Sequence, residues 1–209
     1  MGTLILACRT LARELYHAME RHKCTYPVIW LEAGDHNVPA KRRNAITNAL
    51  AQYPEYDTVL LAMSFCGGAL TGLDSGNHTL VIPRFDDCIE LLLCEPRCPD
   101  TYYLTDGWLD GERNILAEYE RSLERYGKER TERIFGAMLL HYRALAYLES
   151  GGSHTGQDTA RRIAELFHLD FRLESASTRH LEALVTGNWG NFAVISPHTR
   201  ITAEIRRGG

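Results

Sequence analysis

The sequence has no long hydrophobic run and no excess of positive charge, and both absences exclude classes of function. No apolar stretch approaches the roughly 20 residues that a membrane-spanning helix needs. The formal net charge is −4 at pH 7, whereas a protein that binds nucleic acid needs a concentrated basic surface. The pairs Arg42-Arg43 and Arg161-Arg162 lie in expected helices that also carry acidic residues, so we interpret them as solvent-facing. We therefore expect no membrane and no nucleic acid among the partners.

The first residues also lack the features of a targeting signal. Met1-Gly2-Thr3 carries no basic segment, and the apolar run Leu4–Ala7 is too short for a signal peptide. We therefore expect a cytoplasmic protein. In that compartment its six cysteines are thiols, metal ligands or catalytic groups rather than structural disulfides.

The composition is that of an ordinary globular protein in which short apolar runs alternate with helical patterns. With 209 residues, of which 44% are hydrophobic and 24% charged, the chain can bury a sizeable core. The expected strands span residues 3–7, 27–31, 58–63, 79–82, 102–104, 171–173 and 192–195. Their alternation with helices predicts an α/β fold with a Rossmann-like, doubly wound, mostly parallel sheet and flanking helices.

Apolar residues in the segment 109–150 recur at helical spacing, and a helical segment there allows two ways of dividing the chain into domains. The apolar positions continue this spacing through residues 128–149. The helical segment either joins two lobes, residues 1–108 and 151–209, or covers one face of a single domain that spans residues 1–209. No fixed-period repeat and no low-complexity segment is present in the sequence.

A cysteine or histidine follows each of the first four expected strands: Cys8, His36, Cys66 and Cys88. In an open parallel sheet, ligands bind in the crevice beyond the carboxyl ends of the strands. Thiolate and imidazole are the ligands that zinc prefers. A small buried hydrophobe is the commoner role of any one such cysteine, but the fourfold regularity favours a shared metal site. The other cysteines lack this placement and are given less weight: Cys24, Cys94 and Cys98.

The same segments supply further candidate residues. Gly67 and Gly68 allow the backbone to approach a ligand closely, although an ordinary strand-to-helix turn explains them equally well. Arg84 and Asp87 are candidate catalytic residues, because Arg84 could bind an anionic substrate group and Asp87 could orient a metal ligand. The alternative is an Arg–Asp pair that only fixes the loop. We interpret His36 as the fourth metal ligand or an acid–base group, in preference to a capping role at the expected helix that follows.

Three segments resemble hallmark segments of the family called domain of unknown function 1638: residues 64–73, 80–89 and 102–108. The resemblance also includes Cys8, His36-Asn37 with Pro39, and Tyr142 in the expected long helix. It runs over nearly the whole chain. It departs from the family at residues 63–65, where this chain has Met-Ser-Phe and the family tends to have Tyr-Gly-Leu.

Members of this family tend to be encoded near corrinoid-dependent methyltransferases and one-carbon enzymes. The resemblance therefore implies methyl transfer or demethylation, with a small-molecule substrate and a corrinoid delivered by a partner protein. A thiolate-bound zinc ion could activate a substrate thiol or polarise a leaving group. We expect Trp108 and Tyr142 to contact the substrate, although core packing is the commoner role of such rings.

Three alternatives stay open at this point. The cysteines could hold an iron–sulfur cluster with an open iron site. The protein could be a non-catalytic accessory of a corrinoid methyltransferase system. It could also be a cysteine hydrolase in which Cys66 is the nucleophile and His36 the base, although that leaves Cys8 and Cys88 without a role.

Overall fold

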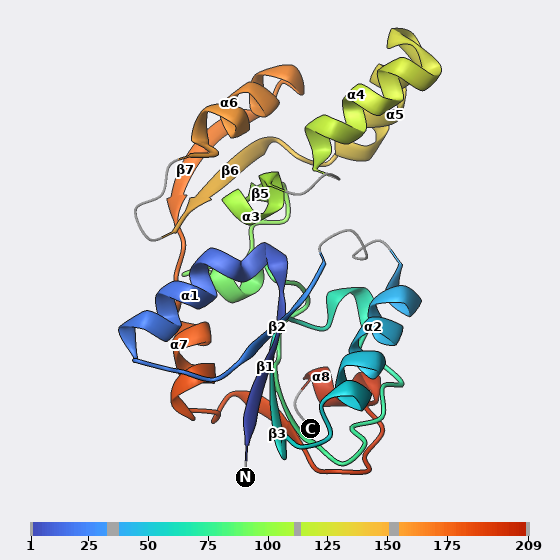
Figure 1. The fold of residues 1–209 in the computed structure, drawn as a ribbon. Coiled ribbons are helices and arrows are strands. Elements are labelled where there is room, and N and C mark those ends of the chain that lie inside the picture. The colour runs from blue at the N-terminus through green and yellow to red at the C-terminus, as the bar shows by residue number, and fades with distance from the viewer. Residues whose placement is uncertain (1, 33–37, 111–113, 151–154, 208–209) are drawn as a thin grey trace. The chain divides into compact units, whose positions relative to one another are not determined.

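The computed structural model describes residues 2–32, 38–110, 114–150 and 155–207, which fall into two units (Figure 1). The first unit comprises Met1–Leu92 and Ser177–Gly209, and the second comprises Leu93–Ala176. The second unit is therefore an insertion in the first. The two ends of the first unit meet where the Ser177 backbone N–H donates to the Leu92 carbonyl at 2.8 Å. This division differs from the two lobes that the sequence suggested.

A five-stranded sheet in the order β2-β1-β3-β4-β8 forms the centre of the first unit. Its strands are β1 (Thr3–Cys8), β2 (Val28–Leu31), β3 (Thr58–Ala62), β4 (Thr79–Pro83) and β8 (Phe192–Ile195). The first four run parallel, while β8 pairs with β4 in the antiparallel sense. Side chains such as Ile5, Leu60 and Val81 are fully buried, as a sheet covered on both faces requires. The predicted Rossmann-like, mostly parallel α/β fold is confirmed.

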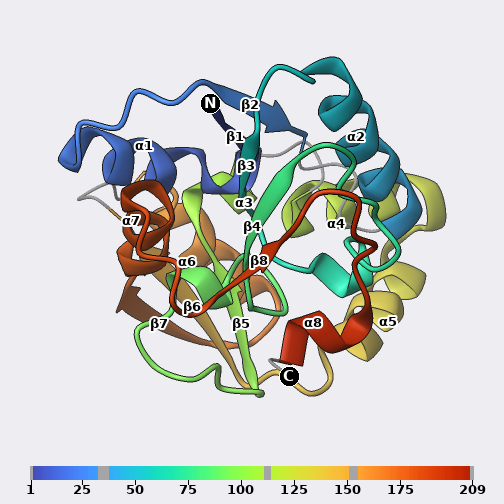
Figure 2. The ribbon, with the colours of Figure 1, turned by 90° about the horizontal axis from the view of Figure 1, so that it is seen from below.

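Helices cover both faces of this sheet. In both views α1 (Ala12–Arg21) and α7 (Arg179–Thr186) lie side by side on one face, and α2 (Pro39–Gln52) covers the other (Figures 1 and 2). Pro39 begins α2, as expected, because a missing N–H costs little in the first helical turn. The remaining elements of this unit are η1 (Arg9–Leu11), η3 (Cys66–Gly68), η4 (Glu90–Leu92) and α8 (Ala203–Arg207).

The direction in which the chain winds changes at β1. From β1 the chain passes through α1 to β2 at one edge of the sheet, and then through α2 to β3 on the other side of β1. In open parallel sheets, the ligand-binding crevice lies at the carboxyl ends of the two strands where this change occurs. Here that position is beside Cys8 and the segment that follows Ala62.

The second unit contains a parallel sheet in the order β5-β6-β7. Its elements are β5 (Thr101–Leu104), α3 (Asp106–Leu109), α4 (Ile115–Tyr126), α5 (Lys128–Leu139), β6 (Ala144–Glu149), α6 (Gln157–Leu166) and β7 (Asp170–Ser175). The rings of Tyr119, Phe135 and Phe167 pack with centroids 5.1 to 5.6 Å apart in its core. Across the described parts of both units, no helix combines the length and apolarity needed to cross a membrane.

The predicted helix over residues 128–149 is wrong in its second half. Helix α5 ends at Leu139, and residues 144–149 form the central strand β6. Leu139, Tyr142 and Leu145 happen to satisfy helical spacing. The continuous apolar run Ala144–Leu148 is instead typical of a strand buried on both faces, and all five of its residues are buried. The segment 109–150 is therefore not a helical connection between lobes.

Candidate metal centre

Three of the predicted ligands lie at the carboxyl ends of three neighbouring parallel strands. Cys8 ends β1, Cys66 follows β3 and Cys88 follows β4. The sulfur atoms of Cys66 and Cys88 are 3.9 Å apart. Hydrogen bonding with Cys66, then with Cys8, together with burial, raises the pKa of the Cys88 thiol well above its ordinary value. The Cys88 thiol therefore interacts with both of the other thiols.

The arrangement of the thiols falls short of a formed metal site. Within the described ranges, no group of three or more Cys, His, Asp and Glu side chains is placed so that it could hold a metal ion. The Cys8 sulfur is 3.0 Å from the Thr10 hydroxyl oxygen. The predicted fourth ligand or acid–base group, His36, lies outside the described residues.

Cys66 occupies an unusual backbone conformation. Its φ is +44°, and those of Gly67 and Gly68 are +64° and +88°. Only glycine adopts positive φ without cost, so Cys66 carries strain of about 1–2 kcal/mol. Arg43 of α2 supports this turn by donating to the carbonyls of Ala69 at 3.2 Å and Gly68 at 3.5 Å. The two glycines thus allow a tight left-handed turn, and their contact with a ligand stays a prediction.

Two hydrogen bonds join the loop that carries Cys66 to the loop that carries Cys88. The buried Ser64 hydroxyl donates to the Asp87 carbonyl at 2.8 Å, and the Phe65 N–H donates to the Phe85 carbonyl at 3.2 Å. The Asp87 carboxylate accepts the Glu90 N–H at 3.1 Å, at the start of the short helix η4. Asp87 therefore helps to shape the Cys88 loop, and a direct role in catalysis stays a prediction.

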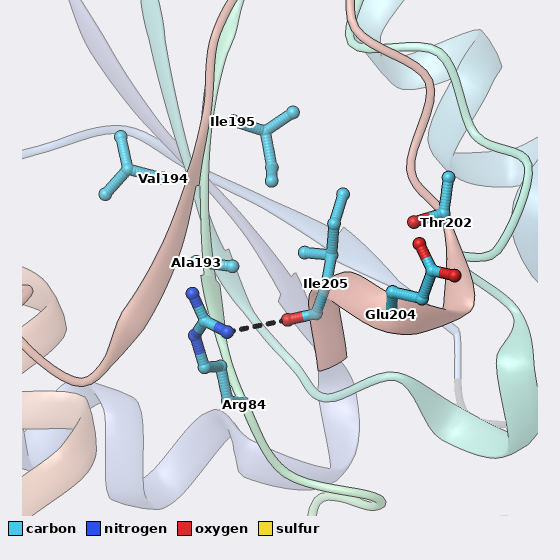
Figure 3. A pocket seen from close by; sticks show the side chains of 7 residues that line it. All are labelled: Arg84, Ala193, Val194, Ile195, Thr202, Glu204 and Ile205. Carbon is cyan, nitrogen blue, oxygen red and sulfur yellow. Dashed lines mark hydrogen bonds between the residues drawn. The ribbon is translucent and has the colours of Figure 1, made fainter. Parts of the chain in front are cut away.

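Arg84 extends toward the carboxyl-terminal segment of the first unit (Figure 3). Its Nη1 donates to the Ile205 carbonyl at 2.8 Å. It lines an open pocket of about 310 Å³ with Ala193, Val194, Ile195, Thr202, Glu204 and Ile205. The sequence placed Arg84 among the catalytic residues. In the structure its observed hydrogen bond connects the end of β4 to α8.

Trp108 and Tyr142 belong to the second unit, where both pack against the hydrophobic core. The Tyr142 ring meets the Tyr102 ring edge-on, with centroids 5.4 Å apart. Burial, and secondarily the charge of Tyr142, raises the pKa of Tyr102 to about 12. Tyr142 lies between α5 and β6 rather than in a long helix. These are packing contacts, and the predicted substrate contacts remain predictions.

Sequence reasoning missed Arg42. The expectation of a solvent-facing side chain is wrong, because Arg42 is only 2% exposed. Its Nη2 lies 3.6 Å from the Cys8 sulfur. The sequence spacing could have indicated this burial, because Arg42 stands four residues before Ile46 and seven before Ala49, which are buried on the same helix. A cationic residue on the inner face of a helix indicates a buried counter-charge.

Comparison with family models identifies the family of this chain. The model of the family described as "Protein of unknown function (DUF1638)" matches residues 30–185. The matched range includes Arg42, Cys66 and Cys88 and begins after Cys8. No curated protein and no solved structure matches the chain.

Proposed function

The chain belongs to the DUF1638 family of proteins of unknown function, and from its own residues we propose that it binds zinc through Cys8, Cys66 and Cys88. The observation that carries this proposal is the 3.9 Å distance between the sulfurs of Cys66 and Cys88. Zinc–thiolate bonds are about 2.3 Å long, so two sulfurs of a tetrahedral site stand about 3.8 Å apart. A disulfide would instead require about 2.05 Å.

Charge also favours a cation among these thiols. Thiols in contact resist ionisation because neighbouring thiolates repel, and the raised pKa of Cys88 reflects its contacts and burial. A divalent ion reverses this preference, because it binds thiolates and releases their protons. Cys8 already interacts with the Cys88 thiol, so in this proposal it supplies the third sulfur. We keep His36 as the fourth ligand or as an acid–base group.

The finer proposal is that the zinc ion serves methyl transfer or demethylation together with a corrinoid on a partner protein. It is supported by the family resemblance and by the ability of thiolate-bound zinc to activate a thiol. In this proposal Arg84, Asp87 and the turn at Gly67-Gly68 would contact or orient a small-molecule substrate. An iron–sulfur cluster and a non-catalytic accessory role remain the alternatives.

Zinc affinity of the reduced protein, measured by competition with a chromophoric chelator, tests the proposal. Cys66→Ser and Cys88→Ser should each weaken binding by at least about a hundredfold, because each removes a direct ligand. Cys24→Ser and Cys94→Ser are the matched controls and should bind as the wild type does. Unchanged affinity in Cys88→Ser would overturn the proposal. If the anaerobically purified protein shows visible absorption from thiolate-to-iron bonds, the cysteines hold an iron–sulfur cluster and not zinc.

A further inference from the structure

Arg42 is a buried cation on the inner face of α2. It is 2% exposed and shares its face of the helix with Ile46, Ala49 and Leu50. Arginine does not lose its proton in proteins, so its charge is buried with it. Burying an ionised group without a counter-charge costs several kcal/mol. The surroundings of Arg42 should therefore contain a negative charge.

No carboxylate in the described ranges supplies that charge. The guanidinium makes one contact there, from Nη2 to the Cys8 sulfur at 3.6 Å, while Nε and Nη1 have no hydrogen-bond partner in this part of the chain. A neutral thiol is only a weak acceptor. A thiolate carries a full charge and accepts much stronger hydrogen bonds. Among the described residues, the Cys8 sulfur is the group that lies closest to the guanidinium by hydrogen bonding, so we take it as the position of the counter-charge.

The Cys8 sulfur has a second potential donor. The buried Thr10 hydroxyl lies 3.0 Å from it, so a hydroxyl and a guanidinium approach the same sulfur from different elements. Donors of this kind around a metal-bound thiolate orient it and strengthen metal binding. The surroundings of Cys8 are therefore suited to an anionic sulfur.

We infer that Arg42 is a positioning residue that neutralises a centre of three thiolates and one divalent metal ion, an inference that rests on the proposed function. Three thiolates and one divalent ion leave a single negative charge, which one guanidinium balances. The centre and Arg42 together form a neutral unit that can be buried. A monovalent ion would leave an excess negative charge, so the arrangement favours divalent metals.

The test compares the free energy of unfolding with and without zinc. Arg42→Met removes the charge and keeps much of the length of the side chain. Without metal, in EDTA, this variant should be as stable as the wild type or more stable, since an unpaired buried cation has gone. With zinc it should be less stable, and its zinc affinity should be lower by about tenfold to a hundredfold. Arg42→Lys should restore most of this affinity.

Lys41→Met is the matched control, because it removes an exposed positive charge from the neighbouring position of α2. It should change neither stability nor zinc affinity. If Arg42 has only a structural role, its replacement should lower stability both in EDTA and with zinc. Loss of stability under both conditions would overturn the inference. Failure of both Arg42→Met and Arg42→Gln to fold would overturn it in the same way. Wild-type zinc affinity in folded Arg42→Met also overturns it and leaves the proposed function standing. Absence of zinc binding in the wild type would reject the proposed function itself.

Discussion

The Cys66 sulfur lies 3.9 Å from the Cys88 sulfur, although the two residues follow different strands. β3 and β4 are parallel neighbours, so the segments that leave them start at the same edge of the sheet. The hydrogen bond from the Ser64 hydroxyl to the Asp87 carbonyl then holds the two segments together. The spacing of the thiols thus depends on this connection as well as on the cysteines themselves.

Ser64→Ala should therefore affect both stability and zinc binding. The change removes a 2.8 Å hydrogen bond and leaves the Asp87 carbonyl without this donor, which costs about 1 kcal/mol in the free energy of unfolding. Zinc affinity should fall by about tenfold, because the Cys66 and Cys88 loops lose one of the two hydrogen bonds that join them. Urea unfolding and chelator competition measure the two effects.

The control for this change is Ser122→Ala in the second unit. It removes a hydroxyl contact of 3.0 Å between Ser122 and Thr131 and should also lower stability, but zinc affinity should not change. Equal zinc affinities of Ser64→Ala and wild type would show that the Ser64 hydrogen bond does not position the thiols.

The positive φ of Cys66 leads to a second prediction. At +44° a side chain is strained, so metal-free Cys66→Gly should be more stable than metal-free Cys66→Ala by about 1 kcal/mol. Both variants should lose zinc binding. Urea unfolding in EDTA measures the difference. If the alanine variant proved equally stable, the left-handed conformation of this residue would be in doubt.

Two glycines of the second unit should respond to alanine with opposite signs. A Cβ at Gly156 would lie 2.5 Å from Asp106 Oδ1 and 2.6 Å from Leu109 Cδ1. The Asp106 carboxylate is held by the Tyr147 hydroxyl at 2.5 Å, so it cannot easily move away. Gly156→Ala should therefore lower the free energy of unfolding by about 1–3 kcal/mol.

Gly136 lies inside α5, and a Cβ added there would meet no atom within 4 Å. Gly136→Ala should stabilise the protein by up to about 1 kcal/mol, because alanine favours the helix. Thermal or urea unfolding of the two variants measures both signs. Destabilisation by both changes would contradict the packing described for α5.

Glu182 makes the stability of the first unit depend on pH. Its pKa is lowered from the ordinary value of 4.5, first by the hydrogen bond with His22, then by that with Thr178. Because the folded pKa lies below the unfolded one, this contribution is present above pH 4.5 and is lost as the pH falls through the folded pKa.

Glu182→Gln should lower stability at pH 7 by less than about 1 kcal/mol, since the carboxylate is partly solvated. The difference from wild type should shrink as the pH falls below 4.5. Glu124→Gln, which removes an exposed carboxylate of α4, is the control. A deficit in Glu182→Gln that grew toward acid pH would contradict the assigned contacts.

The sequence predicted the sheet and the approach of Cys66 to Cys88 because both follow from local patterns. Short apolar runs mark parallel strands, and the ends of such strands meet at one edge, which is why Cys66 and Cys88 could be expected together. The antiparallel direction of β8 depends on which edge the returning chain reaches, and no local pattern encodes that choice.

Other features required the structure. Residues 144–148 suit a helix and a buried strand equally well by periodicity, and only their place between β5 and β7 decides the matter. The insertion of the second unit depends on the contact between Leu92 and Ser177, which are far apart in the sequence. Arg42 was missed because charged residues on helices are usually solvated, and its partner sulfur lies on a different element.

The central claim is tested most directly by the metal content of the purified wild-type protein, prepared anaerobically without added metal. Elemental analysis should find about one zinc ion per chain, and this metal should be missing from Cys88→Ser. Wild-type protein that contains no metal under both aerobic and anaerobic handling, and takes up none when zinc is added, would contradict the account.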